Sequence, residues 1–453
     1  MQRVLVANRG EIAVRIVRAC FDEGLESVLA VSTADRDSLA ARLADRVVVI
    51  GPPAATDSYL SVERIVAAAT STGCDAVHPG YGFLSERPEL AQACADNDLM
   101  FVGPPAEVMR RSGDKLQARA MAATLGIPTG GGTAGLLDPD QAVEAAERLG
   151  LFPCLIKASA GGGGRGMTIA RDADQLRGAF YTSSQEAERA FGDGTLFLER
   201  FVERARHVEV QILADTHGTV IHLGERDCST QRRYQKLIEE APAVGLSDEL
   251  LAGVRNSAIK LAVALGYVSA GTVEFLVDVE RADFLFLELN ARVQVEHPVT
   301  EMVTGVDIVR EQLRIARGDR LSVTQEEVAV DGHSIECRIN AEDATRGFLP
   351  SPRTIKRWTA PQGHGIRIDT FAETGAVVTP YYDSMVAKLI VWAPTRREAV
   401  DLMRRALAKT QVDGPHTTID FHLGVLSHPS FQQEPVTTRW VEDEFLPAWL
   451  KET

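Results

Sequence analysis

The sequence predicts a multidomain protein of α/β and α+β class that begins with a doubly wound α/β domain. At 453 residues the chain is too long for one hydrophobic core and indicates two to four domains. Short apolar runs alternate with helical patterns over residues 3–103, which is typical of doubly wound sheets. Strand patterns dominate from about residue 203 onward.

Five apolar runs in the N-terminal part are expected to form its sheet. Helical patterns such as Ile12–Phe21 and Val62–Ala69 separate most of them. We place this domain at residues 1–112. The five runs are Val4–Ala7, Val28–Val31, Val47–Ile50, Ala76–Val77 and Met100–Val102.

The middle of the chain is expected to start with one helix around Met109–Leu125, which ends before Pro128 because proline cannot continue a helix. A linker and a small α/β unit follow, with strands at Leu155–Ala158 and Met167–Ala170. We place this part at residues 113–202.

Two larger units complete the chain and are placed at residues 203–330 and 331–447. Strand patterns dominate both units. The helices expected in them lie near Leu250–Leu265, Ile308–Arg317 and Arg397–Leu407.

Charge and cysteine content exclude several function classes. The chain has 48 basic and 63 acidic residues and a formal charge of −15, which argues against a nucleic-acid surface and gives no reason to expect an anionic membrane as partner. No apolar run reaches membrane-spanning length, and the amino terminus enters a strand pattern without the layout of a signal peptide. Six scattered cysteines without a CxxC pair indicate reduced thiols of a cytoplasmic protein.

The glycine-rich segment Ser159–Gly166 fits either a hairpin that folds over phosphates or a flexible surface hairpin. Three of its glycines formally match GxGxxG, but a strand rather than a helix is expected next, which excludes a dinucleotide site. The GK[ST] pattern of P-loops is absent from the chain. Glycines let backbone N–H groups approach an anion closely. Lys157 and Arg165 add positive charge, so the phosphate interpretation is favoured.

Polar and apolar residues alternate strictly over Glu288–Glu296. An extended chain puts successive side chains on opposite faces, and the alternative to a functional strand here is an ordinary one with a solvated face. The preceding Phe284–Leu287 is apolar on both faces, as in a strand buried on both sides. A buried strand that continues into charged and amide side chains is typical of a site. The polar face would carry Glu288, Asn290, Arg292, Gln294 and Glu296.

A second strand pattern, Thr272–Val279, precedes this segment and predicts a hairpin. If the hairpin is centred on Arg281, Glu274 lies opposite Glu288; a bulge at the turn would shift the register by one residue. Two carboxylates facing each other destabilise a sheet unless one is protonated or a cation lies between them. Sites with few carboxylates and substrate phosphates typically bind magnesium. The hairpin therefore predicts a site for Mg²⁺ and a nucleotide.

Together these patterns resemble the ATP-grasp superfamily and, within it, the biotin carboxylases. The resemblance covers essentially the whole chain and implies an ATP-grasp lid and large domain, followed by a C-terminal biotin carboxylase domain. It rests on blocks that occur in one order: Ala7–Ala13, His78–Glu86, Gly113–Lys115, Lys157 with its glycine segment, Arg206–Glu209, Glu225–Ser229, Gln231–Arg233, Gln235–Lys236, Glu239–Pro242, Asn290–Pro298 and Glu336–Glu342.

The resemblance implies a two-step reaction. Bicarbonate attacks the γ-phosphate of MgATP (or MnATP) and gives carboxyphosphate, which decomposes to CO₂ and phosphate. Phosphate then deprotonates biotin, and the biotin nitrogen attacks CO₂. By the same resemblance Glu296 is the base for bicarbonate, and a base must lie within hydrogen-bond reach of its proton. The implied bicarbonate ligands are Lys236, Arg292, Gln294 and the backbone of Val295.

The resemblance also implies the remaining ligand sites. Arg338 would stabilise ionised biotin, and Tyr81 would line the biotin pocket. From the local sequence alone, Arg338 fits a salt bridge to Glu336 or Glu342 instead. Lys236 would likewise fit a solvated residue in a charged stretch. The implied metal ligands are Glu274, Glu288 and Asn290. The implied ATP site comprises Lys115, Lys157, Gly161, Gly162, Gly163, Gly164, Met167, Glu199, Arg200, Val202, His207, Gln231, Tyr234, Glu274, Leu276 and Glu288.

Four positions depart from the family pattern and bear on nucleotide affinity more than on the proposed catalytic groups. Tyr234 stands where histidine is common, Arg200 replaces a frequent lysine, Ala160 replaces a glycine and Ala291 a threonine. Because the chain has no Met-Lys-Met biotin-attachment site, the biotin carboxyl carrier protein and an acyl-CoA carboxyltransferase are expected on other chains. A homodimer is also expected.

Two other functions compete with biotin carboxylation. Another ATP-grasp carboxylate ligase would share the Mg²⁺ carboxylates and the glycine segment, but it would lack the full set of Arg292, Gln294, Glu296 and Arg338. A non-catalytic ATP-binding regulator would have lost Glu296 or a metal ligand, and the sequence retains them.

Overall fold

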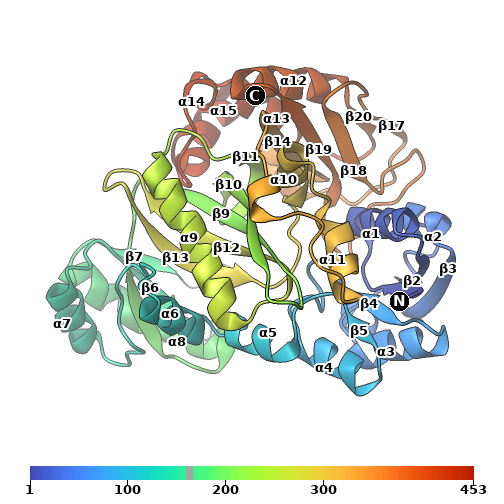
Figure 1. The fold of residues 1–453 in the computed structure, drawn as a ribbon. Coiled ribbons are helices and arrows are strands. Elements are labelled where there is room, and N and C mark those ends of the chain that lie inside the picture. The colour runs from blue at the N-terminus through green and yellow to red at the C-terminus, as the bar shows by residue number, and fades with distance from the viewer. Residues whose placement is uncertain (160–166, 453) are drawn as a thin grey trace.

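The computed structural model describes residues 1–159 and 167–452. Within these residues two larger sheets and one small one carry most of the structure (Figure 1). The N-terminal unit lies at the lower right of Figure 1, the small three-stranded unit at the lower left and the C-terminal part at the top. The strands between them belong to one large sheet, which holds the three regions together.

The N-terminal unit is a five-stranded parallel sheet with order β3-β2-β1-β4-β5, so the predicted doubly wound domain is confirmed. Val4 and Val6 pack into one core and Leu5 into another, because successive side chains of a strand point to opposite faces. Its elements are β1 Arg3–Val6, α1 Gly10–Asp22, β2 Glu26–Ser32, α2 Leu39–Leu43, β3 Arg46–Gly51, η1 Ala55–Asp57, α3 Val62–Ser71, β4 Ala76–His78, α4 Pro88–Asp96 and β5 Met100–Phe101.

The prediction of a single helix around Met109–Leu125 is wrong. Two helices, α5 Ala106–Gly113 and α6 Lys115–Thr124, occupy this stretch. They are separated by Asp114, whose backbone is extended and whose side chain accepts a hydrogen bond from the backbone N–H of Gln117 at 3.0 Å. An N-capping aspartate satisfies a free N–H at the start of a helix, which makes a new helix start favourable here.

The small unit is the three-stranded sheet β7-β6-β8, with α7 and α8 beside it (Figure 1). Leu176 and Phe180 of α8 are buried against Ile156 of β6. The glycines Gly161–Gly164, predicted to bind phosphates, lie outside the described residues. The elements are α7 Pro139–Leu149, β6 Cys154–Ala158, β7 Thr168–Ala170, α8 Ala173–Phe191 and β8 Leu196–Arg200.

One antiparallel eight-stranded sheet, ordered β13-β12-β9-β10-β11-β14-β19-β18, forms the centre of the molecule. It crosses the boundary predicted near residue 330, because β11 pairs with β14 from Ile238–Cys337 to Ala241–Ser334. Side chains from both predicted units therefore share one sheet face. The strands are β9 Ala205–Ala214, β10 Val220–Arg232, β11 Gln235–Ala241, β12 Ser269–Asp278, β13 Asp283–Asn290, β14 His333–Asn340, β18 Ile366–Thr370 and β19 Met385–Ala393.

Helices and short strands surround this sheet. Helix α9 packs mainly against β10 and β9, and α10 lies close to β14 and β19 (Figure 1). The remaining elements are α9 Asp248–Leu265, α10 His297–Thr304, α11 Ile308–Ala316, η2 Gln325–Glu327, β15 Glu342–Asp343, η3 Ala344–Arg346, β16 Leu349–Pro350, β17 Arg357–Thr359, α12 Arg396–Lys409, β20 Gln411–Asp413, α13 Ile419–Ser427, α14 Pro429–Gln433, the π-helix η4 Val441–Phe445 and α15 Leu446–Glu452.

The β12–β13 hairpin places Glu274 opposite Glu288, as predicted. Nearer the turn the pairing register differs by one residue from the predicted register, because Phe275 lies opposite Phe286. Leu287 is left without a partner as a β-bulge, and this extra residue restores the expected register at Glu274.

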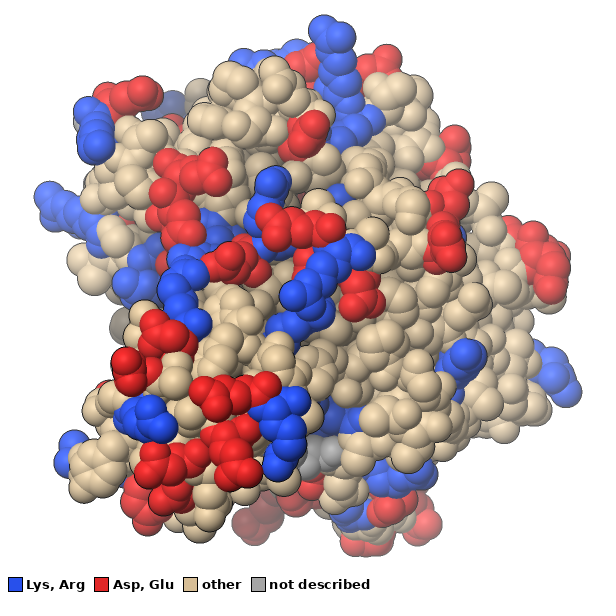
Figure 2. Space-filling model, turned by 90° about the vertical axis from the view of Figure 1, so that its left-hand side faces the viewer, with Lys and Arg blue, Asp and Glu red and all other residues tan. Residues whose placement is uncertain are grey.

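Acidic and basic side chains are interspersed over the face in Figure 2, and among the described residues on this face no extended basic area is seen. This pattern agrees with the net charge of −15. Across residues 1–159 and 167–452, none of the helices combines the length and the apolar character needed to cross a membrane.

Candidate active site

The chain leaves the sheet directly after Asn290, so the predicted extended strand to Glu296 is wrong. β13 ends at Asn290, and Glu296 is the N-cap of α10. The backbone N–H of Ala291 donates to Glu86 Oε1 at 3.2 Å, and His297 Nδ1 lies 2.8 Å from the Gln294 carbonyl oxygen. These contacts fold the segment back over the sheet and bury the side chains of Gln294 and Glu296.

Lys236 of β11 connects three carboxylates from three parts of the chain. Its Nζ donates to Glu209 Oε2 at 2.5 Å, to Glu274 Oε1 at 2.9 Å and to Glu296 Oε1 at 2.6 Å. The Lys236 side chain is 11% exposed, so it is not a solvated residue of a charged stretch. We call Glu209, Lys236, Glu274, Glu296 and Arg338 the central charged cluster.

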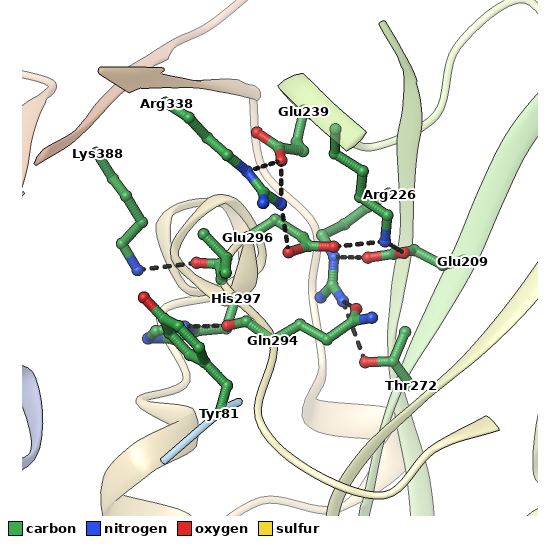
Figure 3. Close-up of polar contacts among 12 residues, drawn as sticks. Tyr81, Glu209, Arg226, Glu239, Thr272, Gln294, Glu296, His297, Arg338 and Lys388 are labelled. Atoms are coloured by element: carbon green, nitrogen blue, oxygen red, sulfur yellow. Dashed lines mark hydrogen bonds and ion pairs between the residues drawn. The ribbon is translucent and has the colours of Figure 1, made fainter. Parts of the chain in front are cut away.

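Arg338 of β14 approaches Glu296 from the other side (Figure 3). Its Nη2 donates to Glu296 Oε2 at 2.9 Å and its Nε to Glu239 Oε1 at 2.6 Å. The locally expected salt bridges to Glu336 or Glu342 are not formed among the described contacts of Arg338. Both oxygens of Glu296 are therefore held by cations, one on each side.

Arg226 of β10 underlies the cluster and is completely buried. It donates to Glu209 Oε1 at 2.6 Å and to Gln294 Oε1 at 2.8 Å. Gln294 in turn donates to Glu274 Oε1 at 2.8 Å. A planar guanidinium with several donors can fix such a set of acceptors in one geometry.

The cations determine the charge state of the carboxyl groups. Burial raises the pKa of Glu296, but Lys236, Arg338 and Arg226 outweigh it and hold that pKa below its usual range. The pKa of Glu274 is likewise lowered well below its usual value, because Lys236 and His207 outweigh burial. Both groups are carboxylates at neutral pH, as a base and a metal ligand require.

Among the predicted bicarbonate ligands, Lys236 and Gln294 donate to Glu274 directly, and Arg292 is linked to it through Asn290. Arg292 donates from Nε to Glu86 Oε2 at 2.9 Å and from Nη2 to Asn290 Oδ1 at 3.0 Å. The Val295 carbonyl oxygen accepts a hydrogen bond from Lys388 Nζ at 2.8 Å. The fold thus brings together residues that the sequence places in widely separated segments.

Glu274, Glu288 and Asn290, whose side chains carry the oxygen donors that a hard divalent cation prefers, lie on the facing strands β12 and β13. Asn290 Nδ2 donates to Glu274 Oε1 at 3.0 Å, and Glu288 lies across the hairpin, with Oε2 3.4 Å from Lys115 Nζ. His207 Nε2 is 3.1 Å from Glu274 Oε2. Burial lowers the pKa of His207, but Glu274 outweighs it and the pKa is raised.

The residues predicted for the nucleotide line the strands toward the small unit. Lys157 of β6 forms an ion pair with Glu199 of β8, and burial together with Arg119 and Lys115 lowers the pKa of Lys157 to about 8. Arg200 Nη2 lies 3.5 Å from Asp278 Oδ2.

The other predicted nucleotide residues differ in how closely they approach the site. Val202 packs with Leu276, whose strand partner is His207. Gln231 lies opposite Lys236, and Met167 is half-buried just before β7. Tyr234 is different: its side chain is 60% exposed at the β10–β11 turn, with φ of 64°.

Sequence reasoning gave no role to several residues that hold the site together. Arg226, Glu209, Glu239 and Glu11 entered only as members of sequence blocks, and Lys388 was missed. Lys388 is the one charged residue in the apolar run Met385–Ala393. A lone charge inside a buried strand is a signal that could have identified it.

Comparisons with known proteins assign each part of the chain to a family. Residues 1–109 match the model "Biotin carboxylase, N-terminal domain", residues 114–324 match "Carbamoyl-phosphate synthase L chain, ATP binding domain", and residues 336–443 match "Biotin carboxylase C-terminal domain". The three matches follow one another along the chain.

Similar full-length proteins and a solved structure agree with these matches. A biotin carboxylase of Nostoc sp. is 48% identical over 97% of this chain and 98% of its own. One pyruvate carboxylase subunit of Methanothermobacter thermautotrophicus is 45% identical over 97% of this chain and 89% of its own. The biotin carboxylase domain dimer of Hydrogenobacter thermophilus 2-oxoglutarate carboxylase, in complex with MgADP, ADP and bicarbonate, is 46% identical with a TM-score of 0.91, over 97% of each chain.

A buried pair of carboxyl groups lies beside the central charged cluster. Glu239 of β11 is directly opposite Glu336 of β14, and both are completely buried. Neither oxygen of Glu336 has a hydrogen-bond partner among the described residues, nor has Glu239 Oε2. Burial, opposed by Arg338, raises the pKa of Glu239 to about 7. Burial, opposed by Lys388 and supported by Glu239, raises the pKa of Glu336 well above its usual range.

We predict that Glu336→Gln stabilises the protein at about pH 8 relative to the wild type. Because the pKa of Glu336 is higher in the folded chain, the folded form retains a proton that the unfolded chain releases above its own pKa of about 4.3. Stability is therefore lost as the pH rises above that value. Glutamine does not titrate, and its amide can donate to Glu239.

The measurement is the melting temperature of both proteins at about pH 8 and about pH 5, with the exposed Glu326→Gln as control. The gain of Glu336→Gln should shrink at the lower pH. A gain that is equal at both pH values, or a loss that grows with pH, would contradict the prediction.

Proposed function

Because this chain belongs to the biotin carboxylase family, we propose that it carboxylates biotin on a biotin carboxyl carrier protein, using ATP and bicarbonate. One observation carries the proposal. Glu296, Lys236 and Arg338 meet in a single buried cluster, with a carboxylate held between two cations. This arrangement can accept a proton and can also bind two anions, bicarbonate and ionised biotin.

The first step is proposed to join bicarbonate to phosphate. Glu296 takes the bicarbonate proton, and a bicarbonate oxygen attacks the γ-phosphorus of ATP while ADP leaves, which gives carboxyphosphate. Lys236 and Arg292 hold the anion, because charge-assisted hydrogen bonds are strong in a buried site. The low pKa of Glu296 supports its being ionised before bicarbonate binds, and Lys236 must shift some of its bonding to the substrate.

The second step is proposed to transfer CO₂ to biotin. Carboxyphosphate breaks into CO₂ and phosphate, phosphate removes the ureido N–H proton, and the nitrogen attacks CO₂. Arg338 stabilises the negative oxygen of ionised biotin, and Tyr81 lines the biotin pocket. The 2.9 Å contact between Arg338 and Glu296 supports this assignment, because it sets the two half-reactions side by side.

The residues present fit a magnesium or manganese ion and a nucleotide. Glu274, Glu288 and Asn290 offer the oxygen donors that Mg²⁺ prefers, and a bound ion would neutralise phosphate charge during transfer. Lys115 and Lys157 are proposed to contact phosphates. The other proposed nucleotide contacts are Gly161–Gly164, Met167, Glu199, Arg200, Val202, His207, Gln231, Tyr234 and Leu276.

The proposed assembly is a homodimer that works with a separate carrier protein and an acyl-CoA carboxyltransferase. A dimer of the Hydrogenobacter biotin carboxylase domain supports the first part. The Nostoc protein, similar over 98% of its length, supports a free-standing subunit. Relatives named as parts of pyruvate and 2-oxoglutarate carboxylases indicate that similar chains serve different acceptors. A cytoplasmic location is proposed as well, supported by six free, buried cysteines.

The function is tested by ADP release with and without bicarbonate, and with and without free biotin. Bicarbonate-dependent ADP release that biotin stimulates, with formation of carboxybiotin, is expected. ADP release that depends on a different carboxylate substrate and ignores biotin would favour another ATP-grasp ligase.

We predict that Glu296→Gln and Arg338→Gln fail differently. Glutamine at position 296 keeps the shape but cannot accept a proton, so ATP cleavage and biotin carboxylation should both fall by about 10²–10⁴-fold. Arg338→Gln should leave slow bicarbonate-dependent ATP cleavage in place and reduce carboxybiotin formation much further.

The measurement is ADP release against carboxybiotin formation for both variants at saturating MgATP. Wild-type ATP cleavage by Glu296→Gln would show that the assigned base is wrong. A proportional loss of both activities in Arg338→Gln would assign that residue to the ATP half-reaction.

We predict that Glu288→Gln lowers turnover by about 10²-fold or more, because it removes a proposed metal ligand. A gain in melting temperature from relief of Glu274–Glu288 repulsion is not expected, since Lys236 and His207 compensate Glu274 and Lys115 lies near Glu288.

The measurement is turnover against Mg²⁺ concentration, with melting curves in the presence of a chelator. Glu280→Gln in the hairpin turn is the matched control. Unchanged turnover at every Mg²⁺ concentration would exclude Glu288 from the metal site.

A further inference from the structure

Lys388 of β19 is a completely buried lysine whose ammonium reaches the segment before Glu296. Its Nζ donates to the Val295 carbonyl oxygen at 2.8 Å, and a dashed line in Figure 3 runs from the end of the Lys388 side chain. This carbonyl belongs to the peptide bond that joins Val295 to Glu296. Lys388 therefore holds the backbone from which the proposed base projects.

Glu11 of α1 fixes the ammonium from the N-terminal unit. Lys388 Nζ lies 3.1 Å from Glu11 Oε1 and 3.9 Å from Asp369 Oδ2 of β18. The same Glu11 oxygen accepts a hydrogen bond from the Tyr81 hydroxyl. Tyr81, Glu11, Lys388 and Val295 thus form one chain of contacts from the proposed biotin side to the proposed bicarbonate side.

The position of this lysine has a cost that stability alone does not explain. β19 pairs with β14 so that Lys388 lies opposite Arg338, and two cations on one sheet face repel each other. Replacing a buried ion pair by apolar side chains is often neutral or stabilising. In the apolar sequence of β19, an aliphatic residue at this position would pack without the free-energy cost of burying an ammonium group.

We propose that Lys388 is a positioning residue for Glu296, held in place by Glu11. Its ammonium fixes the Val295–Glu296 peptide, so that the Glu296 carboxylate and the Val295 backbone keep the geometry that bicarbonate requires. The proposal rests on the proposed function, because it assigns Lys388 to the bicarbonate half of that reaction.

The test compares Lys388→Met, Glu11→Gln and the double variant with the wild type. Lys388→Met leaves Glu11 buried without its cation, so its melting temperature should fall; the double variant removes both charges and should recover stability. Activity should behave differently. In both Lys388→Met and the double variant, kcat/KM for bicarbonate should fall by about 10²-fold, as for a misplaced reacting group, while the KM for ATP stays unchanged.

A matched control is the buried pair of Arg396 and Glu240, in which Arg396 Nε donates to Glu240 Oε2 at 2.6 Å. Neither residue belongs to the central charged cluster. The double variant Arg396→Met with Glu240→Gln should leave kcat/KM for bicarbonate unchanged. If the Lys388–Glu11 double variant recovers both stability and bicarbonate kinetics, Lys388 is only structural and the proposal is overturned. If the wild type itself shows no bicarbonate-dependent ADP release, the proposed function fails first.

Discussion

The three contacts of the Lys236 ammonium are the interaction on which the rest of the site depends. Glu209, Glu274 and Glu296 come from β9, β12 and the segment after β13, and their oxygens all lie within 2.9 Å of one nitrogen. Three buried carboxylates without this cation would repel one another and lose hydration. The hydrogen bonds of Arg226 and Arg338 compensate the remaining negative charge of these carboxylates. Each charged group of the cluster therefore depends on the others for its stability.

The large sheet makes this set possible. β9, β10, β11 and β12 are adjacent, and β14 and β19 continue the sheet into the C-terminal part. Because the sheet is continuous, Lys236, Arg338 and Lys388 lie on adjoining strands rather than on separate domains. The pairing between β11 and β14 also brings Glu239 opposite Glu336. The site therefore combines high charge density with a rigid support, which suits a reaction that needs oriented anions.

For the β12–β13 hairpin, the local sequence pattern predicted some features correctly and others not. Alternation and turn position predicted that Glu274 faces Glu288, and this pairing is confirmed. The bulge at Leu287 was not predicted, because a single extra residue leaves the hydrophobic pattern almost unchanged. The segment beyond Asn290 was predicted as strand from its alternation. In the fold, the Ala291 N–H donates to Glu86, which is distant in sequence, and His297 Nδ1 contacts the Gln294 carbonyl oxygen. These contacts take the segment off the sheet.

The sequence by itself determined the doubly wound N-terminal sheet, the hairpin with its two carboxylates and the family to which the motifs belong. These depend on periodicity and on short blocks, and both are local properties of the chain. Only the tertiary structure decided which charges meet. Arg338 binds Glu239 and Glu296 rather than its sequence neighbours, and Lys388 binds a carbonyl 93 residues away. Such pairings follow from strand order and chain path, which long-range packing sets and local patterns do not encode.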